Sequence, residues 1–310
     1  MRKEFYYFCR MKFFTYLLFK VFILIFWLIP FWVVYLFSDG IYFLAYYVAG
    51  YRKKVVIDNI RNSFPEKDEK QVRQIVEGFY HYLCDILLES IKAFSMSEPE
   101  VIKRYEFENT GFLEDIYKQG KSVICVAGHY GNWEWAGLAS GPQVMHRPVG
   151  FYKPLSNKMI DAEVQKTRVK GRSLLVSIAN TSAVFSKDYG EPAIFYMVAD
   201  QSPSSVRLAY WMQFMNQDTA VLHGPEKYAR LYNFPVVFAY TRRIKRGYYK
   251  VDFSMLVEDP SKTEPGEITR QYMRRLEKII FDKPEYYLWS HKRWKHKRDS
   301  EIAKQRDSEK

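Results

Sequence analysis

Residues 122–134 read SVICVAGHYGNWE, and this stretch decides the fold. Residues 122–127 form a short, uncharged and largely apolar run, which predicts a strand buried on both faces of a sheet. A helix is expected from Trp133 onward, and the glycines at 128 and 131 allow a tight turn between strand and helix. A buried strand that leads directly into a helix is the repeating unit of α/β proteins with a parallel sheet.

The chain downstream repeats this alternation. Further apolar runs predict buried strands at 173–178, 193–199 and 235–240. Helical composition is found at 133–140, 158–170 and 225–232, and a long amphipathic pattern covers 69–94. Residues 248–257 are expected to add an antiparallel edge strand. We therefore expect an α/β sandwich with a largely parallel central sheet flanked by helices.

The first fifty residues are apolar and aromatic. Residues 13–37 read FFTYLLFKVFILIFWLIPFWVVYLF, with Lys20 as the single charge. A helix of this length would be about 37 Å long, enough to cross the hydrocarbon core of a bilayer. A cleaved signal peptide fits poorly, because the run is too long, and a buried core helix is the alternative. Pro30 lies inside the run, so a spanning helix and a re-entrant hairpin both remain open.

The charge balance points to an acidic partner. The 310 residues include 47 Lys and Arg against 35 Asp and Glu, a formal net charge of +12, which suits anionic lipid, an acidic carrier protein or nucleic acid. Basic clusters at 242–250 and 291–298, beside an apolar anchor, favour lipid headgroups over nucleic acid. The three cysteines form no CxxC pair, which argues against a disulfide scaffold.

The turn at 128–134 holds the strongest candidate site. Open α/β sheets bind their ligands beyond the carboxyl ends of the strands, where this turn is expected. His129 and Glu134 can meet only if the residues between them form a turn, which Gly131 permits. Asn132 is a good helix N-cap, and we expect both Gly131 and Asn132 to contact the substrate. A carboxylate on one imidazole nitrogen would leave the other to remove a proton from a hydroxyl, so we predict His129 as a general base with Glu134 as its partner.

Other polar residues are candidates to bind substrate. Asp200 and Gln201 follow the run at 193–199, so they are expected at the same cleft, although the turn-forming sequence ADQSPSS also suits a simple loop. Lys153 offers a cation near that face. Asn216 and Thr219 lie in a polar segment before Gly224. No GxSxG or HExxH motif is present, so a nucleophile-elbow hydrolase and zinc chemistry are unsupported.

Five blocks in order resemble the bacterial lipid A biosynthesis acyltransferases, the late (lauroyl/myristoyl) family, which is related more distantly to the glycerophospholipid and lysophospholipid acyltransferases. The blocks are NIRNSFP (59–65), GHYGNWE (128–134), FYKPLSN (151–157), ADQ (199–201) and PEYYLWSHKRWK (284–295). With the apolar N-terminus, the likeness covers nearly the whole chain. Lys153 stands where family members usually carry arginine, and residues 216–218 differ from the commoner glycine-containing loop.

The resemblance implies a fold, a location and a reaction. An acyltransferase-type domain at 55–295 would be held to the cytoplasmic face of the bacterial inner membrane by an anchor at 1–54, with a mobile charged tail at 296–310. The enzyme would move a fatty acyl chain from a thioester, on acyl carrier protein or coenzyme A, to a hydroxyl of an anionic lipid A precursor. No metal or diffusible cofactor is implied, and nucleic acid is not an expected partner.

The family assigns His129 as base and Glu134 as its partner. Backbone N–H groups at the start of the following helix, or Lys153, would stabilise the oxyanion. The alternatives are an acyltransferase for another membrane acceptor (a lysophospholipid, aminolipid or glycolipid) and a non-catalytic, membrane-tethered basic protein that binds lipid.

Overall fold

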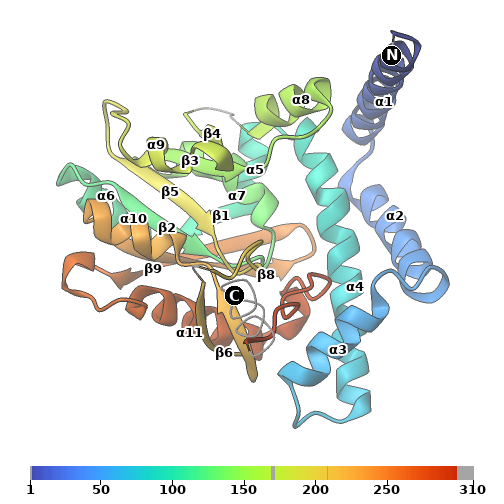
Figure 1. The fold of residues 1–310 in the computed structure, drawn as a ribbon. Coiled ribbons are helices and arrows are strands. Elements are labelled where there is room, and N and C mark those ends of the chain that lie inside the picture. Colours follow the sequence, from blue (N-terminus) through green and yellow to red (C-terminus); the bar gives the residue numbers. More distant parts are fainter. Residues whose placement is uncertain (1, 169–171, 208, 299–310) are drawn as a thin grey trace.

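A seven-stranded sheet forms the centre of the protein (Figure 1). The computed structural model describes residues 2–168, 172–207 and 209–298. The strands of the sheet, in spatial order, are β1 (Tyr105–Glu108), β9 (Tyr248–Val257), β8 (Val236–Lys245), β2 (Val123–Ala127), β5 (Ala193–Val198), β3 (Arg147–Tyr152) and β4 (Leu174–Ser177). A separate antiparallel hairpin pairs β6 (Tyr210–Phe214) with β7 (Gln217–Val221).

The sheet is largely parallel, as the sequence predicted. β8, β2, β5, β3 and β4 run in one direction, whereas β9 is antiparallel to β8 and β1 is parallel to β9. The strand expected at 248–257 is thus antiparallel, but its prediction as an edge strand was wrong, because β1 pairs with its outer side. The first four residues of β2, Val123 to Val126, are fully buried, which explains their apolar character.

Helices flank the sheet (Figure 1). The α-helices are α1 (Arg2–Leu28), α2 (Phe31–Phe43), α3 (Lys53–Ser63), α4 (Glu69–Lys92), α5 (Glu98–Arg104), α6 (Gly111–Lys118), α7 (Trp133–Gln143), α8 (Lys158–Arg168), α9 (Thr181–Phe185), α10 (Gly224–Tyr232) and α11 (Glu267–Asp282). Short helices of other types are η1 (Leu44–Val48), η2 (Ala93–Ser95), η3 (Ile178–Asn180), η4 (Pro260–Lys262) and η5 (Pro284–Tyr286). α7 packs against β1 and β3, and α11 packs against β9.

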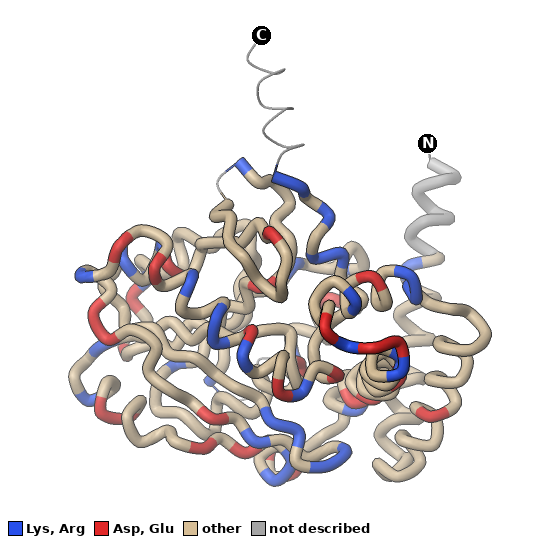
Figure 2. Tube along the Cα trace, turned by 90° about the horizontal axis from the view of Figure 1, so that it is seen from below, with Lys and Arg blue, Asp and Glu red and all other residues tan. Residues whose placement is uncertain are grey.

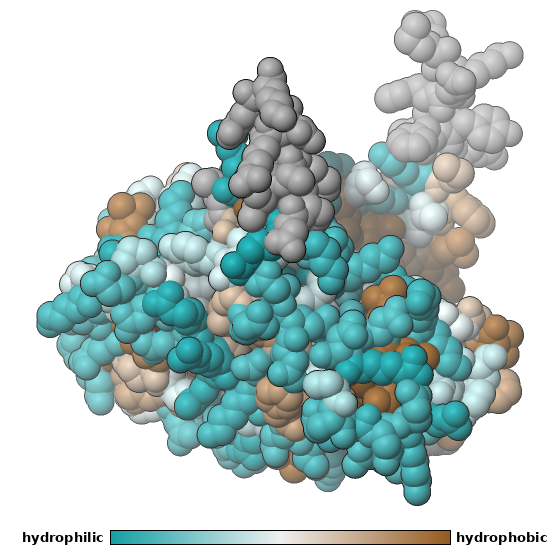
Figure 3. Space-filling model, turned by 60° about the horizontal axis from the view of Figure 1, so that its bottom comes forward, coloured by the Kyte–Doolittle hydropathy of each residue, from teal (hydrophilic) through white to brown (hydrophobic). Residues whose placement is uncertain are grey.

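The apolar N-terminus forms two helices that meet at Pro30. Both Met11–Leu28 and Phe31–Val48 are long and apolar enough to cross a membrane, with 6% and 22% of their residues buried. Trp27 and Trp32 are among the exposed apolar side chains, and Figure 3 shows apolar side chains gathered over the N-terminal helices. Helices so exposed do not belong to the core of a soluble domain, and they support membrane association.

Helix α4 holds the corner between α1 and α2. The buried Lys92 donates hydrogen bonds to the carbonyls of Phe26 (2.6 Å) and Ile29 (2.8 Å), at the end of α1, where Pro30 supplies no N–H group. Burial lowers the pKa of Lys92. Ser38 of α2 donates a hydrogen bond to Asp85 of α4 (2.7 Å), and Asp85 also forms ion pairs with Arg243 and Arg246. The corner is therefore fixed to the body of the protein by buried polar contacts.

Positive charge gathers near the C-terminus. Figure 2 shows Lys and Arg along the segment that leads into the tail. Arg298 forms an ion pair with Asp218 (2.6 Å), and His296 donates to the carbonyl of Pro203 (3.0 Å). The mobile tail predicted for 296–310 thus begins with two ordered contacts, and residues 299–310 lie outside the described residues.

Candidate active site

The polar residues predicted at one cleft follow neighbouring strands. β2 pairs with β5 in parallel, and Ala127 lies opposite Val198. His129 lies two residues beyond the end of β2, and Asp200 lies two residues beyond the end of β5. Continuing the register of the two strands therefore brings these residues together. β3 is the next strand beyond β5, and Lys153 follows its last residue. The carboxyl ends of β2 and β5 therefore bring His129 and Asp200 together, at the position where such sheets bind ligands, and Lys153 follows the end of the next strand.

His129 is held by two hydrogen bonds to the Asp200 carboxylate. Its Nδ1 lies 2.6 Å from Oδ1, and its backbone N–H donates to Oδ2 at 3.0 Å. Asp200 is 1% exposed. A carboxylate accepts only, so Nδ1 carries the proton and Nε2 carries the lone pair. The side-chain amide of Gln201 lies 3.0 Å from Nε2 and donates to that lone pair.

The surrounding charges make the imidazole more basic. Burial disfavours the imidazolium, but the Asp200 carboxylate and the charge of Glu134 more than offset burial and raise the pKa of His129. Burial also works against the Asp200 carboxylate, yet the contacts with His129 and the charge of Arg293 keep the pKa of Asp200 below its usual value. The two groups thus favour each other's charged forms.

Glu134 occupies a different place from the one expected. Sequence spacing led us to place its carboxylate on a nitrogen of His129, whereas the carboxylate bonded to Nδ1 is that of Asp200. Glu134 stands in the first turn of α7 and accepts a hydrogen bond from the Trp133 indole (3.2 Å), whose ring meets the His129 ring edge to face at 5.3 Å. Glu134 acts on the imidazole through its charge.

Gly131 and Asn132 shape the turn between β2 and α7. Gly131 has φ +61°, and a Cβ there would lie 2.8 Å from the backbone oxygen of Thr241. Asn132 caps α7, as predicted, with its Oδ1 accepting from the Trp135 N–H at 3.1 Å. The Asn132 side chain is fully buried and its Nδ2 donates to Glu89. Both residues, predicted near substrate, hold the turn in place.

Comparison with known proteins identifies the family. The sequence matches the family described as bacterial lipid A biosynthesis acyltransferase over residues 5–296. The chain belongs to this family. It is 24% identical over 278 residues to the lipid A biosynthesis lauroyltransferase of Escherichia coli (strain K12), covering 87% of this chain and 88% of that protein. The protein is therefore an acyltransferase.

Two other relatives agree with this assignment. The lipid A biosynthesis acyltransferase of Haemophilus influenzae is 22% identical over 238 residues, which are 74% of this chain and 72% of that protein. The lipid A biosynthesis palmitoleoyltransferase of Escherichia coli (strain K12) is 19% identical over 245 residues, 79% of each chain.

Two of the predicted substrate residues of this lipid A acyltransferase lie on the β6–β7 hairpin. Asn216 stands in its tight turn, donates to the carbonyl of Ser63 (3.0 Å), and helps to line a cavity of about 570 Å³. Thr219 is 1% exposed; its hydroxyl donates to the Gln217 carbonyl and accepts from the Trp294 indole (2.8 Å). Thr219 was predicted to contact substrate, but its hydroxyl connects the β6–β7 hairpin to Trp294. Lys153, by contrast, is exposed.

The block at 284–295 supports the site, a role that our sequence analysis did not assign. The N–H of Leu288 donates to the His129 carbonyl (3.2 Å). Burial lowers the pKa of His291 to about 4, so its neutral ring accepts from the Ser202 N–H (3.0 Å). Arg293 is 2% exposed and donates to the Ala220 carbonyl. The block carried the family resemblance, and that likeness was the signal that could have revealed this role.

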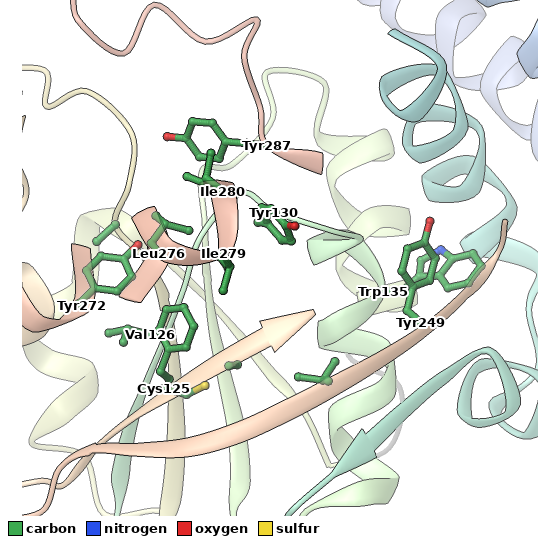
Figure 4. Close-up of a cluster of buried hydrophobic side chains, with 14 of the residues drawn as sticks. Cys125, Val126, Tyr130, Trp135, Tyr249, Tyr272, Leu276, Ile279, Ile280 and Tyr287 are labelled. Carbon is green, nitrogen blue, oxygen red and sulfur yellow. The ribbon is translucent and has the colours of Figure 1, made fainter. Parts of the chain in front are cut away.

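A cluster of buried apolar side chains packs against the turn between β2 and α7. Figure 4 shows side chains of α11 between Tyr287 on one side and Cys125 and Val126 of β2 on the other. A Cβ on Gly128 would lie 2.4 Å from Leu276, so the turn packs closely on α11. Among the residues that the structure describes, no group of three His, Cys, Asp or Glu side chains is arranged to hold a metal ion.

Gly131→Ala is expected to destabilise the acyltransferase by about 1–3 kcal/mol, because an alanine there has both a strained φ and a clash with backbone. The control is Gly137→Ala within α7, where a Cβ meets nothing within 4 Å and where alanine favours the helix. Thermal unfolding should show a lower midpoint for the first variant alone. Equal midpoints for the two variants would contradict the strain argument.

Proposed function

We propose that this enzyme transfers a fatty acyl chain from an acyl thioester, carried by acyl carrier protein, to a hydroxyl of a lipid A precursor, with His129 as the general base. The observation that carries the proposal is the His129–Asp200 pair at the ends of β2 and β5, in a chain that matches the family almost throughout. The names of the relatives, a lauroyltransferase and a palmitoleoyltransferase, describe acyl transfer in lipid A biosynthesis.

The orientation of His129 suits proton removal. Asp200 fixes Nδ1–H, so Nε2 faces the reaction with its lone pair. The acceptor hydroxyl replaces the Gln201 amide at Nε2 and loses its proton as its oxygen attacks the thioester carbonyl. The tetrahedral intermediate then expels the thiolate, which receives the proton from His129. Asp200 and Glu134 stabilise the imidazolium in between.

Three of the backbone N–H groups near the start of α7 already have partners within the protein. The N–H groups of Gly131, Trp133 and Trp135 donate to Tyr286, Gly131 and Asn132 respectively, at 3.1–3.2 Å. These backbone donors are thus used within the protein. We therefore assign oxyanion or headgroup binding to the exposed Lys153, whose ammonium acts as a point charge.

The proposed location follows from the anchor and the charge. The two exposed apolar segments would attach the enzyme to the inner membrane, with the catalytic residues on the cytoplasmic side, where thioester donors are made. The net charge of +12 would attract both an anionic lipid acceptor and an acidic carrier protein.

The proposal is tested by incubating the purified full-length protein with a lipid A precursor and a panel of acyl donors. Mass spectrometry should show one added acyl chain, formed faster from acyl carrier protein than from coenzyme A. Parallel reactions offer a lysophospholipid, an aminolipid or a glycolipid as acceptor. Preferential acylation of one of these would replace lipid A precursor as the substrate, and no product with any thioester would overturn the reaction itself.

A further inference from the structure

A fully buried carboxylate connects the first apolar segments to the active-site turn. We infer that Glu89 is a positioning residue, and that through it helix α2 of the anchor holds the start of α7 and thereby the turn that carries His129. The kinetic part of this inference rests on the proposed function; its structural part does not.

Glu89 binds side chains from three other elements. Its carboxylate accepts from the Asn132 amide (2.7 Å), from the Tyr249 hydroxyl (2.7 Å) and from the Tyr35 hydroxyl (2.9 Å). These residues belong to the turn before α7, to β9 and to α2. Glu89 itself lies in α4 and is 0% exposed. Burial raises the pKa of Glu89 to about 7, while the hydrogen bonds from Tyr249 and Tyr35 act in the opposite direction and favour the carboxylate.

The contacts on the active-site side fix the first turn of α7. Asn132 donates to Glu89 and accepts from the Trp135 N–H, so its amide bridges α4 and α7. The Trp135 indole donates to the Glu89 carbonyl at 3.0 Å. Glu89 thus holds α7 twice, and α7 begins four residues after His129. Figure 4 shows Trp135 beside Tyr249, whose ring lies 5.8 Å away.

The contacts on the anchor side come from one helix. Tyr35 of α2 reaches Glu89, and Phe31, one turn earlier, meets the Trp135 ring edge to face at 6.0 Å. One turn later, Ser38 binds Asp85. Helix α2 therefore contacts the support of the active site through an apolar and a polar contact. An anchor that served for attachment alone would need neither the contact of Phe31 with Trp135 nor that of Tyr35 with Glu89.

The experiment compares Tyr35→Phe with Tyr42→Phe, which makes the same change on the same helix. Tyr42 stacks on His81 and Tyr46, away from Glu89. We expect Tyr35→Phe to lower kcat about tenfold with an unchanged KM for the acyl donor, since one hydrogen bond to a buried carboxylate is lost. Tyr42→Phe should keep the wild-type kcat, and both variants should remain in the membrane fraction.

Hydrogen exchange gives a readout that is independent of acyl transfer. Tyr35→Phe should speed amide exchange at residues 133–136 relative to Tyr42→Phe. If the wild-type protein transfers no acyl chain, the proposed function fails, and faster exchange still supports the link. If the two variants agree in both kcat and exchange, or if Tyr35→Phe lowers only the melting temperature, the inference is overturned. Glu89→Gln places an amide against three donors, so it should lower kcat more than Tyr35→Phe does.

Discussion

His129→Ala should lower the kcat of acyl transfer by about 10²–10⁴-fold, the range that a general base contributes. The side chain of His129 is 18% exposed and pairs with the buried Asp200 carboxylate, so the fold of the variant is checked before its rate is compared. The measurement is single-turnover acyl transfer by a variant whose membrane fraction and circular dichroism match the wild type.

The matched control is His81→Ala. His81 is exposed and stacks on Tyr42 at 3.5 Å, and it makes no contact with His129 or Asp200 that the structure records. This variant should keep the wild-type rate, so a general effect of losing an imidazole is distinguished from the loss of the base. Wild-type rates for His129→Ala would end the proposed mechanism.

Asp200→Asn should reduce kcat by about 10²–10⁴-fold, because an amide can donate to Nδ1 and so turn the imidazole into the wrong tautomer. The pH profile of kcat/KM should change as well. The neutral imidazole is the active form, and Asp200 contributes strongly to raising the pKa of His129. With that contribution lost and burial unchanged, the acidic limb of the profile moves to lower pH.

Glu134→Gln separates the two carboxylates. Its charge also raises the pKa of His129, so the acidic limb should move in the same direction but less far, while the Nδ1 bond to Asp200 stays intact. Thermal unfolding checks that each variant is folded. A larger loss from Glu134→Gln than from Asp200→Asn would restore Glu134 as the partner on the ring.

Local pattern was enough to predict the buried strands of this protein but not its polar or irregular ones. β2, β5 and the first half of β8 are apolar runs with buried positions, so a strand was the natural prediction for each. β1 reads YEFE, and its charges do not suggest a strand in the core. β3 reads RPVGFY, and its proline and glycine are unusual within a strand. The β6–β7 turn uses Met215 and Asn216 at positive φ, without the glycine that usually marks such a hairpin.

The sequence indicated His129 and Asp200 separately, each just after the end of a predicted strand, because that rule depends on local order. Which carboxylate binds the ring depends on β5 lying next to β2, and on the register between them, neither of which is local. For the same reason Glu89, 43 residues before Asn132, carried no sequence signal for a role at Asn132.

The Lys92 ammonium that closes the corner at Pro30 has a consequence for the whole enzyme. If both apolar helices rest in the same bilayer, as their exposed apolar side chains suggest, a fixed angle between them restrains rotation and tilting of the attached domain. The orientation of His129 relative to the lipid surface is then fixed as well.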